Sequence, residues 1–261
     1  MPEEEAPQND LLFITVFNRG ALPLALNHLQ SLKNQGITEN YRAYVTDPEC
    51  VGILKDHGFL NCELVTSAPA ATTCLNNQES LDFGSKAFYN LNYLRFHVIG
   101  QLLAQGKTVW YMDVDTVVTG DVQQVAAQII SSSASPPLDL AMQTDINMLC
   151  TGCMLCFPTP KTRQLVDLVY ASQYDIGDQI VLRDILNNFP DFWNIHVFDP
   201  MDFPNGLLYF SELHANPAYR KMQEEFRKSS TPPPKFVHAN WMVGNDKKIQ
   251  AFKDKGLWFV S

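Results

Sequence analysis

The chain has 261 residues, of which 46% are hydrophobic, so it can fold as one large domain around a core that needs neither metals nor disulfides. Its formal net charge of −9 argues against nucleic acid as a partner, because phosphate backbones bind basic surfaces. No stretch has the length of a transmembrane helix, and the first residues lack the basic and apolar regions of a secretory signal. We therefore expect the chain as written to be soluble, without a membrane segment.

Strands and helices are predicted to alternate along the first part of the chain. Residues 1–10 are expected to form a flexible N-terminal segment. Apolar and β-branched runs predict strands, and leucine-rich stretches closed by Gly36 or Gly58 predict helices. The expected strands are 11–17, 41–46 and 62–66, and the expected helices are 21–35 and 47–58. This alternation predicts an α/β fold with a mostly parallel, Rossmann-like sheet flanked by helices.

The middle of the chain continues the pattern. Residues 67–83 are small and polar and predict a loop, and the apolar positions of 85–105 predict a long helix that Gly106 ends. A strand that ends near Met112 and a helix at 121–131 follow. The Ser- and Pro-rich segment 131–137 predicts a flexible connection. We expect one domain, 11–261, with two functional halves, 11–130 and 138–261, the second mixing strands and helices.

Two aspartates stand at the end of a hydrophobic run, in the sequence Met112-Asp113-Val114-Asp115. In an extended chain alternate side chains point to the same side, so both carboxylates can face one point. They repel each other unless a hard cation lies between them. The same pattern occurs in solvated turns, but the bulky apolar residues before it favour the mouth of a buried strand. This is the Asp-X-Asp signature of glycosyltransferases that use a sugar nucleotide.

Other polar residues follow the predicted strands at the same edge of the sheet. Ligands of open α/β sheets bind beyond the carboxyl ends of the strands. The convergence of these ends predicts a nucleotide pocket, in which Asp47 either accepts a hydrogen bond from a uracil N–H or caps the helix that follows it. The candidate nucleotide contacts from these ends are Thr15, Phe17, Asn18, Asp47, Asp113 and Val114.

The six cysteines do not predict a metal site. Cys150, Cys153 and Cys156 lie close together, but no second Cys/His pair at ligand spacing accompanies them. The run reads as a strand, where alternation places Cys153 on the face opposite Cys150 and Cys156. We therefore interpret these cysteines as small buried hydrophobes.

Three further segments, taken with Asp-X-Asp, resemble a known family. They are the Tyr-, Asn- and Arg-rich helix 86–105, the pair Asp178-Gln179, and the C-terminal segment 235–258, which contains His238-Ala239-Asn240-Trp241. Over residues 11–258 the chain resembles the nucleotide-diphospho-sugar transferase domain of glycosyltransferase family 77. That group includes plant cell-wall xylosyl- and arabinosyltransferases and protist galactosyltransferases. The resemblance implies a GT-A fold, a Mn²⁺ or Mg²⁺ ion, a UDP-sugar donor and retention of the anomeric configuration.

The resemblance also implies roles for single residues. Asp113, Asp115 and His238 match the metal ligands, a set that suits Mn²⁺ better than Mg²⁺. Asp178 and Gln179 match the catalytic pair beside the donor sugar, although Asp178 can equally cap a helix. Thr151-Gly152 departs from the Asn-Ser-Gly often found there. Candidate contacts to phosphate or sugar are Lys86, Arg95, Asn240, Gly244, Lys247 and Lys248, with either lysine of the last pair as the phosphate ligand. Gln143, Thr144 and Asp145 are donor or acceptor candidates, and Trp241, Trp193 and Phe192 either stack on a sugar or belong to the core.

The expected function is transfer of a sugar from UDP-xylose, UDP-galactose, UDP-glucose or UDP-arabinose to a hydroxyl of a glycan or glycoprotein. Front-face displacement and double displacement through Asp178 are both open. A nucleotidyltransferase and a non-catalytic sugar-nucleotide or glycan binder are the alternatives. An intact chain is expected in the cytoplasm, and a catalytic domain of a longer anchored parent in the Golgi or ER lumen; the sequence leaves both open. It leaves the oligomeric state open.

Overall fold

The computed structural model describes residues 11–66, 81, 83–132, 137–172, 176–228 and 233–261. The expected N-terminal segment 1–10, nearly all of the expected loop 67–83 and most of the expected connection 131–137 lie outside the described residues. In the described part of the chain, no helix combines the length and the apolar character needed to cross a lipid bilayer.

A seven-stranded sheet forms the centre of the molecule, in the order β3-β2-β1-β4-β7-β6-β8. Strands β3, β2, β1 and β4 are parallel, β6 and β8 are parallel, and β7 runs antiparallel to both of its neighbours. The mostly parallel sheet is thus as the sequence predicted. The strands are β1 (Leu11–Phe17), β2 (Tyr41–Val45), β3 (Cys62–Leu64), β4 (Thr108–Met112), β6 (Leu140–Asp145), β7 (Met148–Cys156) and β8 (Ile195–Val197).

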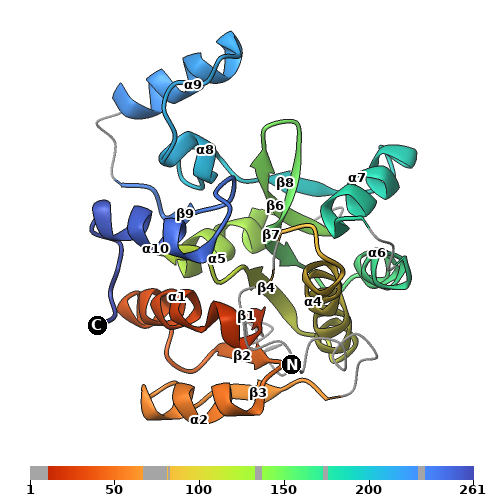
Figure 1. Ribbon diagram of the computed structural model, residues 1–261. Coiled ribbons are helices and arrows are strands. Elements are labelled where there is room, and N and C mark those ends of the chain that lie inside the picture. The colour runs from red at the N-terminus through yellow and green to blue at the C-terminus, as the bar shows by residue number, and fades with distance from the viewer. Residues whose placement is uncertain (1–10, 67–80, 82, 133–136, 173–175, 229–232) are drawn as a thin grey trace, which may run out of the picture.

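Helices cover both faces of this sheet (Figure 1). One core cluster joins α1 (Leu22–Asn34), α2 (Pro48–Asp56) and α5 (Val122–Ser132) to one face. The other cluster joins α4 (Lys86–Ala104), α6 (Pro160–Ala171) and α7 (Asp178–Asn188) to the opposite face. A short 3-10 helix, η1 (Arg19–Ala21), precedes α1. The strands contribute side chains to both core clusters, because successive side chains point to opposite faces of the sheet. In β4, Trp110 and Met112 belong to the first cluster, and Val109 and Tyr111 belong to the second.

The cysteines of β7 follow the same alternation. Cys153 belongs to the first core cluster and Cys156 to the second, and both are buried free thiols. Burial raises the pKa of each of these two thiols to about 12. They are small core residues, as the sequence predicted.

The C-terminal part of the chain returns to the first half through a two-stranded sheet. β5 (Thr116–Val118) pairs antiparallel with β9 (Phe236–His238), so that His238 lies opposite Thr116. Val237 and Ala239 pack with Leu24 of α1 in a third core cluster. The remaining helices are α8 (Gly206–Tyr209), α9 (Pro217–Lys228), which projects from the body in Figure 1, and α10 (Asn245–Asp254).

A β-bulge interrupts the β6–β7 pairing where the sheet meets this second part. Met142 pairs with Met154, but the next residue, Gln143, pairs with Cys150, so residues 151–153 are extra on β7. A bulge bends its strand and redirects side chains, and bulges are common beside active sites. Here Gly152 of the bulge lies against Asp113, the first residue after β4, and Gln143 lies against His238 of β9.

Candidate functional site

Asp113 is the first residue after β4 and continues the face of the strand that packs against α4. Its Oδ1 accepts hydrogen bonds from the Tyr111 hydroxyl (2.5 Å) and from Nη1 of Arg95 (2.9 Å). Its backbone N–H donates to the carbonyl of Gly152 in the bulge (2.8 Å). The Asp113 carboxylate is therefore held through one oxygen by two buried side chains, and its Oδ2 is directed toward His238.

Arg95 is buried inside α4 and holds more than one group of the site. Its Nη1 also donates to the carbonyl of Thr151 (3.1 Å), and its Nε lies 3.6 Å from the Asp178 carboxylate. Burial alone lowers the pKa of an arginine, but the charges of Asp113 and Asp178 outweigh it and raise the Arg95 pKa above its ordinary value. Arg95 is thus a permanent buried cation that links these two carboxylates. Arg95 thereby fixes the positions of both carboxylates.

Asp115 meets His238 across the β5–β9 junction. The carbonyl of Asp115 accepts from the N–H of Ala239 (2.8 Å), and its Oδ1 lies 3.3 Å from Nε2 of His238. Its Oδ2 accepts from Nζ of Lys248 in α10 (2.6 Å). Burial raises the Asp115 pKa, but Lys248 and His238 outweigh this effect and hold the pKa well below its usual range. Asp115 is an ionised carboxylate near neutral pH.

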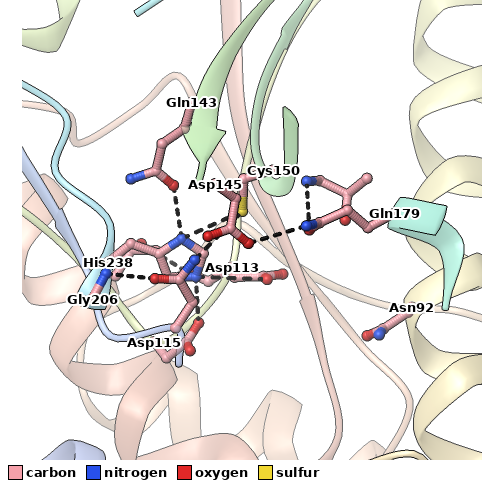
Figure 2. Close-up of polar contacts among 12 residues, drawn as sticks. Asn92, Asp113, Asp115, Gln143, Asp145, Cys150, Gln179, Gly206 and His238 are labelled. Atoms are coloured by element: carbon pink, nitrogen blue, oxygen red, sulfur yellow. Dashed lines mark hydrogen bonds and ion pairs between the residues drawn. The ribbon is translucent and has the colours of Figure 1, made fainter. Parts of the chain in front are cut away.

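Three ligand atoms, one each from Asp113, Asp115 and His238, lie within 4.8 Å of one another (Figure 2). Two carboxylates and an imidazole form a donor set that a divalent transition-metal ion such as Mn²⁺ binds. The set combines the end of a strand in the first half of the chain with a strand near the C-terminus. It forms the candidate metal centre.

The ring orientation of His238 is fixed by Gln143. The Gln143 amide nitrogen donates to the carbonyls of Phe203 (3.1 Å) and Pro204 (3.0 Å), which can only accept. The amide oxygen must then face Nδ1 of His238, 2.9 Å away, so Nδ1 carries the proton. Nε2 points at the two carboxylates and is the ring nitrogen left to bind a metal ion. Hydrogen bonding of the other ring nitrogen commonly orients metal-bound histidines in this way.

Gly152 has no space for a side chain. A Cβ at this position would lie 2.5 Å from Asp113 Oδ2 and 2.5 Å from His238 Cε1. The carbonyl of Gly152 meanwhile holds the backbone of Asp113. The glycine lets the bulge of β7 approach both ligands closely, which no other residue type allows.

The turn between the two aspartates is supported from α1. The Thr116 hydroxyl donates to the carbonyl of Asp113 (2.6 Å), so it accepts from Nδ1–H of His28 (2.9 Å). Burial lowers the His28 pKa to about 4, although the carbonyl of Thr116 and the two aspartates raise it in part. His28 is therefore neutral near pH 7 and acts as a fixed hydrogen-bond donor.

Asp178 and Gln179 begin α7 and lie beside the same centre. Asp178 is buried, and its side chain does not cap the helix, because Gly177 occupies the N-cap position. Gln179 donates to Oδ2 of Asp145 (3.0 Å) and accepts from the Thr151 N–H (3.4 Å). Oδ1 of Asp145 accepts from the indole N–H of Trp241 (2.5 Å). The capping alternative for Asp178 is therefore wrong, and a chain of hydrogen bonds runs outward from the bulge.

Lys248 and Lys247 differ in position. Lys248 reaches Asp115, whereas Lys247 is exposed on α10. Gly244 is the N-cap of α10, with φ of 98°. Asn240 accepts from the N–H of Gly206 (2.6 Å) and thus ties α8 to the segment after β9.

The strand-end candidates divide into polar groups at the sheet edge and core residues. Thr15 is buried, with a hydroxyl that has no hydrogen-bond partner among the described residues. Asp47 caps α2 by accepting from the Glu49 N–H (2.9 Å). Asn18 is buried. The side chain of Phe17, by contrast, belongs to the core, and Val114 is half-buried against it.

Two aromatic candidates lie away from the centre, and Lys86 is turned to solvent. Phe192 and Trp193 precede β8, whose first residue pairs with the first residue of β6, whereas the candidate site follows the last residues of β6. These two aromatics therefore lie at the opposite end of β6 from the metal ligands, and Trp193 packs against the second core cluster. Lys86 is exposed at the start of α4.

Two supporting residues, Thr116 and His28, escaped the sequence interpretation. Gln143 and Gly152 were noted in the sequence, but not as the partner of His238 and as the close neighbour of two metal ligands. A threonine directly after Asp-X-Asp was a weak signal for Thr116, and a histidine on the apolar face of a helix was a weak signal for His28. The bulge that assigns Gln143 and Gly152 to the site left no local signal.

Gln143→Leu is expected to weaken Mn²⁺ binding about 10- to 100-fold, because His238 loses the acceptor that fixes its tautomer. Isothermal titration calorimetry with Mn²⁺ measures this affinity. Gln223→Leu is the matched control, since Gln223 is an equally buried amide that donates to the carbonyls of Leu207 and Glu212, away from the centre. The control should retain Mn²⁺ affinity, and equal loss in both variants would assign the effect to folding.

A family model described as nucleotide-diphospho-sugar transferase matches residues 46–252, most of the chain. The chain belongs to this family. Its similar relatives include an Arabidopsis thaliana UDP-D-xylose:L-fucose alpha-1,3-D-xylosyltransferase, 24% identical over 71% of this chain and 54% of the relative. A Dictyostelium discoideum UDP-galactose:fucoside alpha-3-galactosyltransferase is 21% identical over 99% of this chain and 44% of the relative. The chain spans about half the length of the curated relatives it matches.

Solved structures of similar fold confirm the expected GT-A architecture. The galactosyltransferase LgtC, in complex with donor and acceptor sugar analogues, superposes with a TM-score of 0.56 at 16% identity, covering 94% of each chain. Mouse xyloside xylosyltransferase 1 superposes with a TM-score of 0.51 at 12% identity, covering 88% of this chain and 97% of the mouse chain. This chain is therefore a member of the nucleotide-diphospho-sugar transferase family with a GT-A fold.

Proposed function

We propose that this protein is a metal-dependent, retaining glycosyltransferase that moves a sugar from a UDP-sugar to a hydroxyl of a glycan or glycoprotein acceptor. The observation that carries the proposal is the convergence of Asp113, Asp115 and Nε2 of His238 on one point at the carboxyl edge of the sheet. An edge of this kind is where α/β sheets bind nucleotides.

The residues present fit a divalent cation. Asp113, Asp115 and His238 supply three ligand atoms to one point, and Gln143 orients the His238 ring. Gly152 has no side chain that would crowd these ligands. Oxygen and imidazole donors together favour Mn²⁺, with Mg²⁺ as the alternative. When bound, such an ion supplies Lewis-acid stabilisation of a departing diphosphate.

The nucleotide would lie along the ends of β1 and β2, where Thr15, Asn18 and Asp47 offer polar groups. The unpartnered hydroxyl of Thr15 has no other use in the described structure. We assign the phosphate contact to Lys248, because its ammonium group already reaches the Asp115 carboxylate and Lys247 is turned to solvent. Lys248 would then exchange Asp115 for phosphate when the metal and the nucleotide bind.

The donor sugar would lie beside Asp178 and Gln179. Asp178 is buried against Arg95, so it is better suited to orient sugar hydroxyls than to attack the anomeric carbon. We therefore favour front-face displacement. The acceptor oxygen bonds to the anomeric carbon on the face from which the UDP oxygen leaves with its electron pair, and the acceptor proton passes to that phosphate oxygen. A covalent sugar adduct trapped on Asp178 would establish double displacement instead.

The names of the relatives suggest substrates to test. They pair UDP-xylose or UDP-galactose with fucose or a fucoside. We propose the same classes for this protein, with UDP-glucose and UDP-arabinose as further donors to screen.

The test is UDP release from each UDP-sugar with Mn²⁺, with and without methyl α-L-fucoside. The proposal expects slow UDP release alone, faster release with the fucoside, and loss of both with a chelator. Pyrophosphate formation from UTP and a sugar phosphate would establish a nucleotidyltransferase. UDP binding without turnover over a broad acceptor panel would establish a non-catalytic binder.

Lys248→Met is expected to lower the affinity for UDP in the presence of Mn²⁺ about tenfold, because a charge-assisted contact to phosphate is lost. Without nucleotide, the same variant should bind Mn²⁺ at least as well as the wild type, because the competing cation on Asp115 is gone. Calorimetry in both conditions separates the two effects. Lys247→Met is the control and should match the wild type, and a loss in Lys247→Met but not in Lys248→Met would reverse our assignment.

A further inference from the structure

Trp241 is unusual among the large aromatic residues near the site. Its side chain is 55% exposed, whereas Trp110 in β4 is fully buried. Its backbone has φ of 66°, in the left-handed region that a bulky residue adopts only at a cost. An exposed indole contributes little to the core, and backbone strain of this kind is retained mainly at functional sites.

Hydrogen bonds fix one edge of the indole. Its N–H donates to Asp145, the other oxygen of Asp145 accepts from Gln179, and Gln179 accepts from the N–H of Thr151 in the bulge. Figure 2 shows Asp145 and Gln179 in this arrangement beside the metal ligands. The indole is therefore oriented by the same frame that orients the donor-sugar side of the site.

Two residues that directly follow members of this hydrogen-bond chain are also exposed and apolar. Ile146 follows Asp145 at the β6–β7 turn and Ile180 follows Gln179 in α7, and both side chains are exposed. Asp178 and Asp145 are buried and Gln179 is half-buried, so Trp241 is the exposed end of this hydrogen-bond chain. A molecule that arrives from solvent would contact the exposed end of this chain first.

We propose that Trp241 binds the acceptor by stacking its indole on the C–H face of a pyranoside, with 6-deoxyhexosides as the preferred class. This inference rests on the proposed function. A pyranose ring offers a face of C–H groups to an aromatic ring, and a 6-methyl group extends the apolar area that the indole buries. The pinned N–H edge leaves the ring preorganised, so little conformational entropy is lost on binding. Trp241 is a specificity-determining residue for the acceptor.

The experiment measures binding by tryptophan fluorescence with UDP and Mn²⁺ present. Methyl α-L-fucoside is the probe, and methyl α-L-galactoside, which carries a hydroxyl on C6, is its comparison. We expect the fucoside to change the emission of the wild type and to bind more tightly than the galactoside. Trp241→Ala should weaken fucoside binding about tenfold or more, the scale of a lost apolar contact in a specific pocket. It should also remove most of the preference for the fucoside.

Three variants keep the result interpretable. Trp241→Phe retains a ring but no N–H and should keep part of the affinity. Trp241→Gly relieves the left-handed backbone, so a loss of fucoside binding in this variant cannot be attributed to backbone strain. Trp193→Phe removes an indole at the opposite end of β6 and β8 and should retain the fucoside-induced change.

The outcomes separate this inference from the proposed function. If UDP-sugar turnover is present but Trp241→Ala binds the fucoside as the wild type does, the inference is overturned and the function stands. If Trp241→Ala instead raises the KM for the UDP-sugar and leaves the fucoside KM unchanged, Trp241 serves the donor and the inference is again overturned. Absence of turnover and of UDP binding would remove the proposed function itself.

Discussion

A Gly152→Ala variant is expected to lose Mn²⁺ affinity about 100-fold or more, with a parallel loss of any sugar transfer. The added Cβ would stand 2.5 Å from both the Asp113 oxygen and the His238 ring carbon. Neither neighbour can withdraw easily. Asp113 is held by Arg95 and Tyr111, and His238 is held by Gln143. Calorimetry with Mn²⁺ and UDP release measure the two effects.

Gly152→Ala also carries a cost in stability of about 1–3 kcal/mol, because the bulge must shift to admit the methyl group. Thermal unfolding of the metal-free protein reports this cost separately. Gly52→Ala is the matched control: Gly52 lies in α2 with open space around its Cβ position, so alanine there should stabilise the helix slightly and leave Mn²⁺ affinity unchanged. Wild-type Mn²⁺ affinity in Gly152→Ala would show that the metal is bound elsewhere.

An Asp115→Asn variant is expected to lose activity about 10³-fold, because a neutral amide replaces an ionised carboxylate that no other described residue can substitute at this point. The amide is nearly the same size as the carboxylate, so the buried position remains filled. Lys248 loses its ionic partner, and His238 loses one of the two carboxylates that face it. UDP release at saturating UDP-sugar, over a range of Mn²⁺ concentrations, measures the loss.

The control for this change is Asp121→Asn. Asp121 is an exposed aspartate that caps the next helix by accepting from the Gln124 N–H, so its replacement alters a charge without reaching the centre. It should retain wild-type Mn²⁺ dependence. Activity of Asp115→Asn that equals wild type without added metal would contradict a metal-dependent transfer.

The sheet was predictable because its local signals agree. The apolar run of β1 and the glycine-terminated leucine pattern of α1 each specify one element, and their repetition specifies a mostly parallel order. The antiparallel insertion of β7 was not predictable, because a buried strand has the same apolar pattern in either direction. The pairing of β5 with β9 joins residues more than a hundred positions apart, and periodicity contains no information about such a contact.

The candidate site divides in the same way. The sequence by itself determined that two carboxylates would stand at the end of a buried strand, because apolar burial is a local property of residues 109–112. Alternation did not bring Asp115 to the site, because Val114 and Asp115 form a turn after β4. The resemblance of the C-terminal segment added His238 to the two carboxylates.

Only the tertiary structure decided how these ligands are held. The bulge of β7 brings Gly152 against two ligands and aligns Gln143 with His238, and α10 brings Lys248 rather than Lys247 to Asp115. These contacts join segments that are distant in the chain, and their geometry depends on the packing of both halves. The physical reason is that the sequence gives the chemical type of each side chain, whereas the fold determines which hydrogen-bond partner that side chain meets.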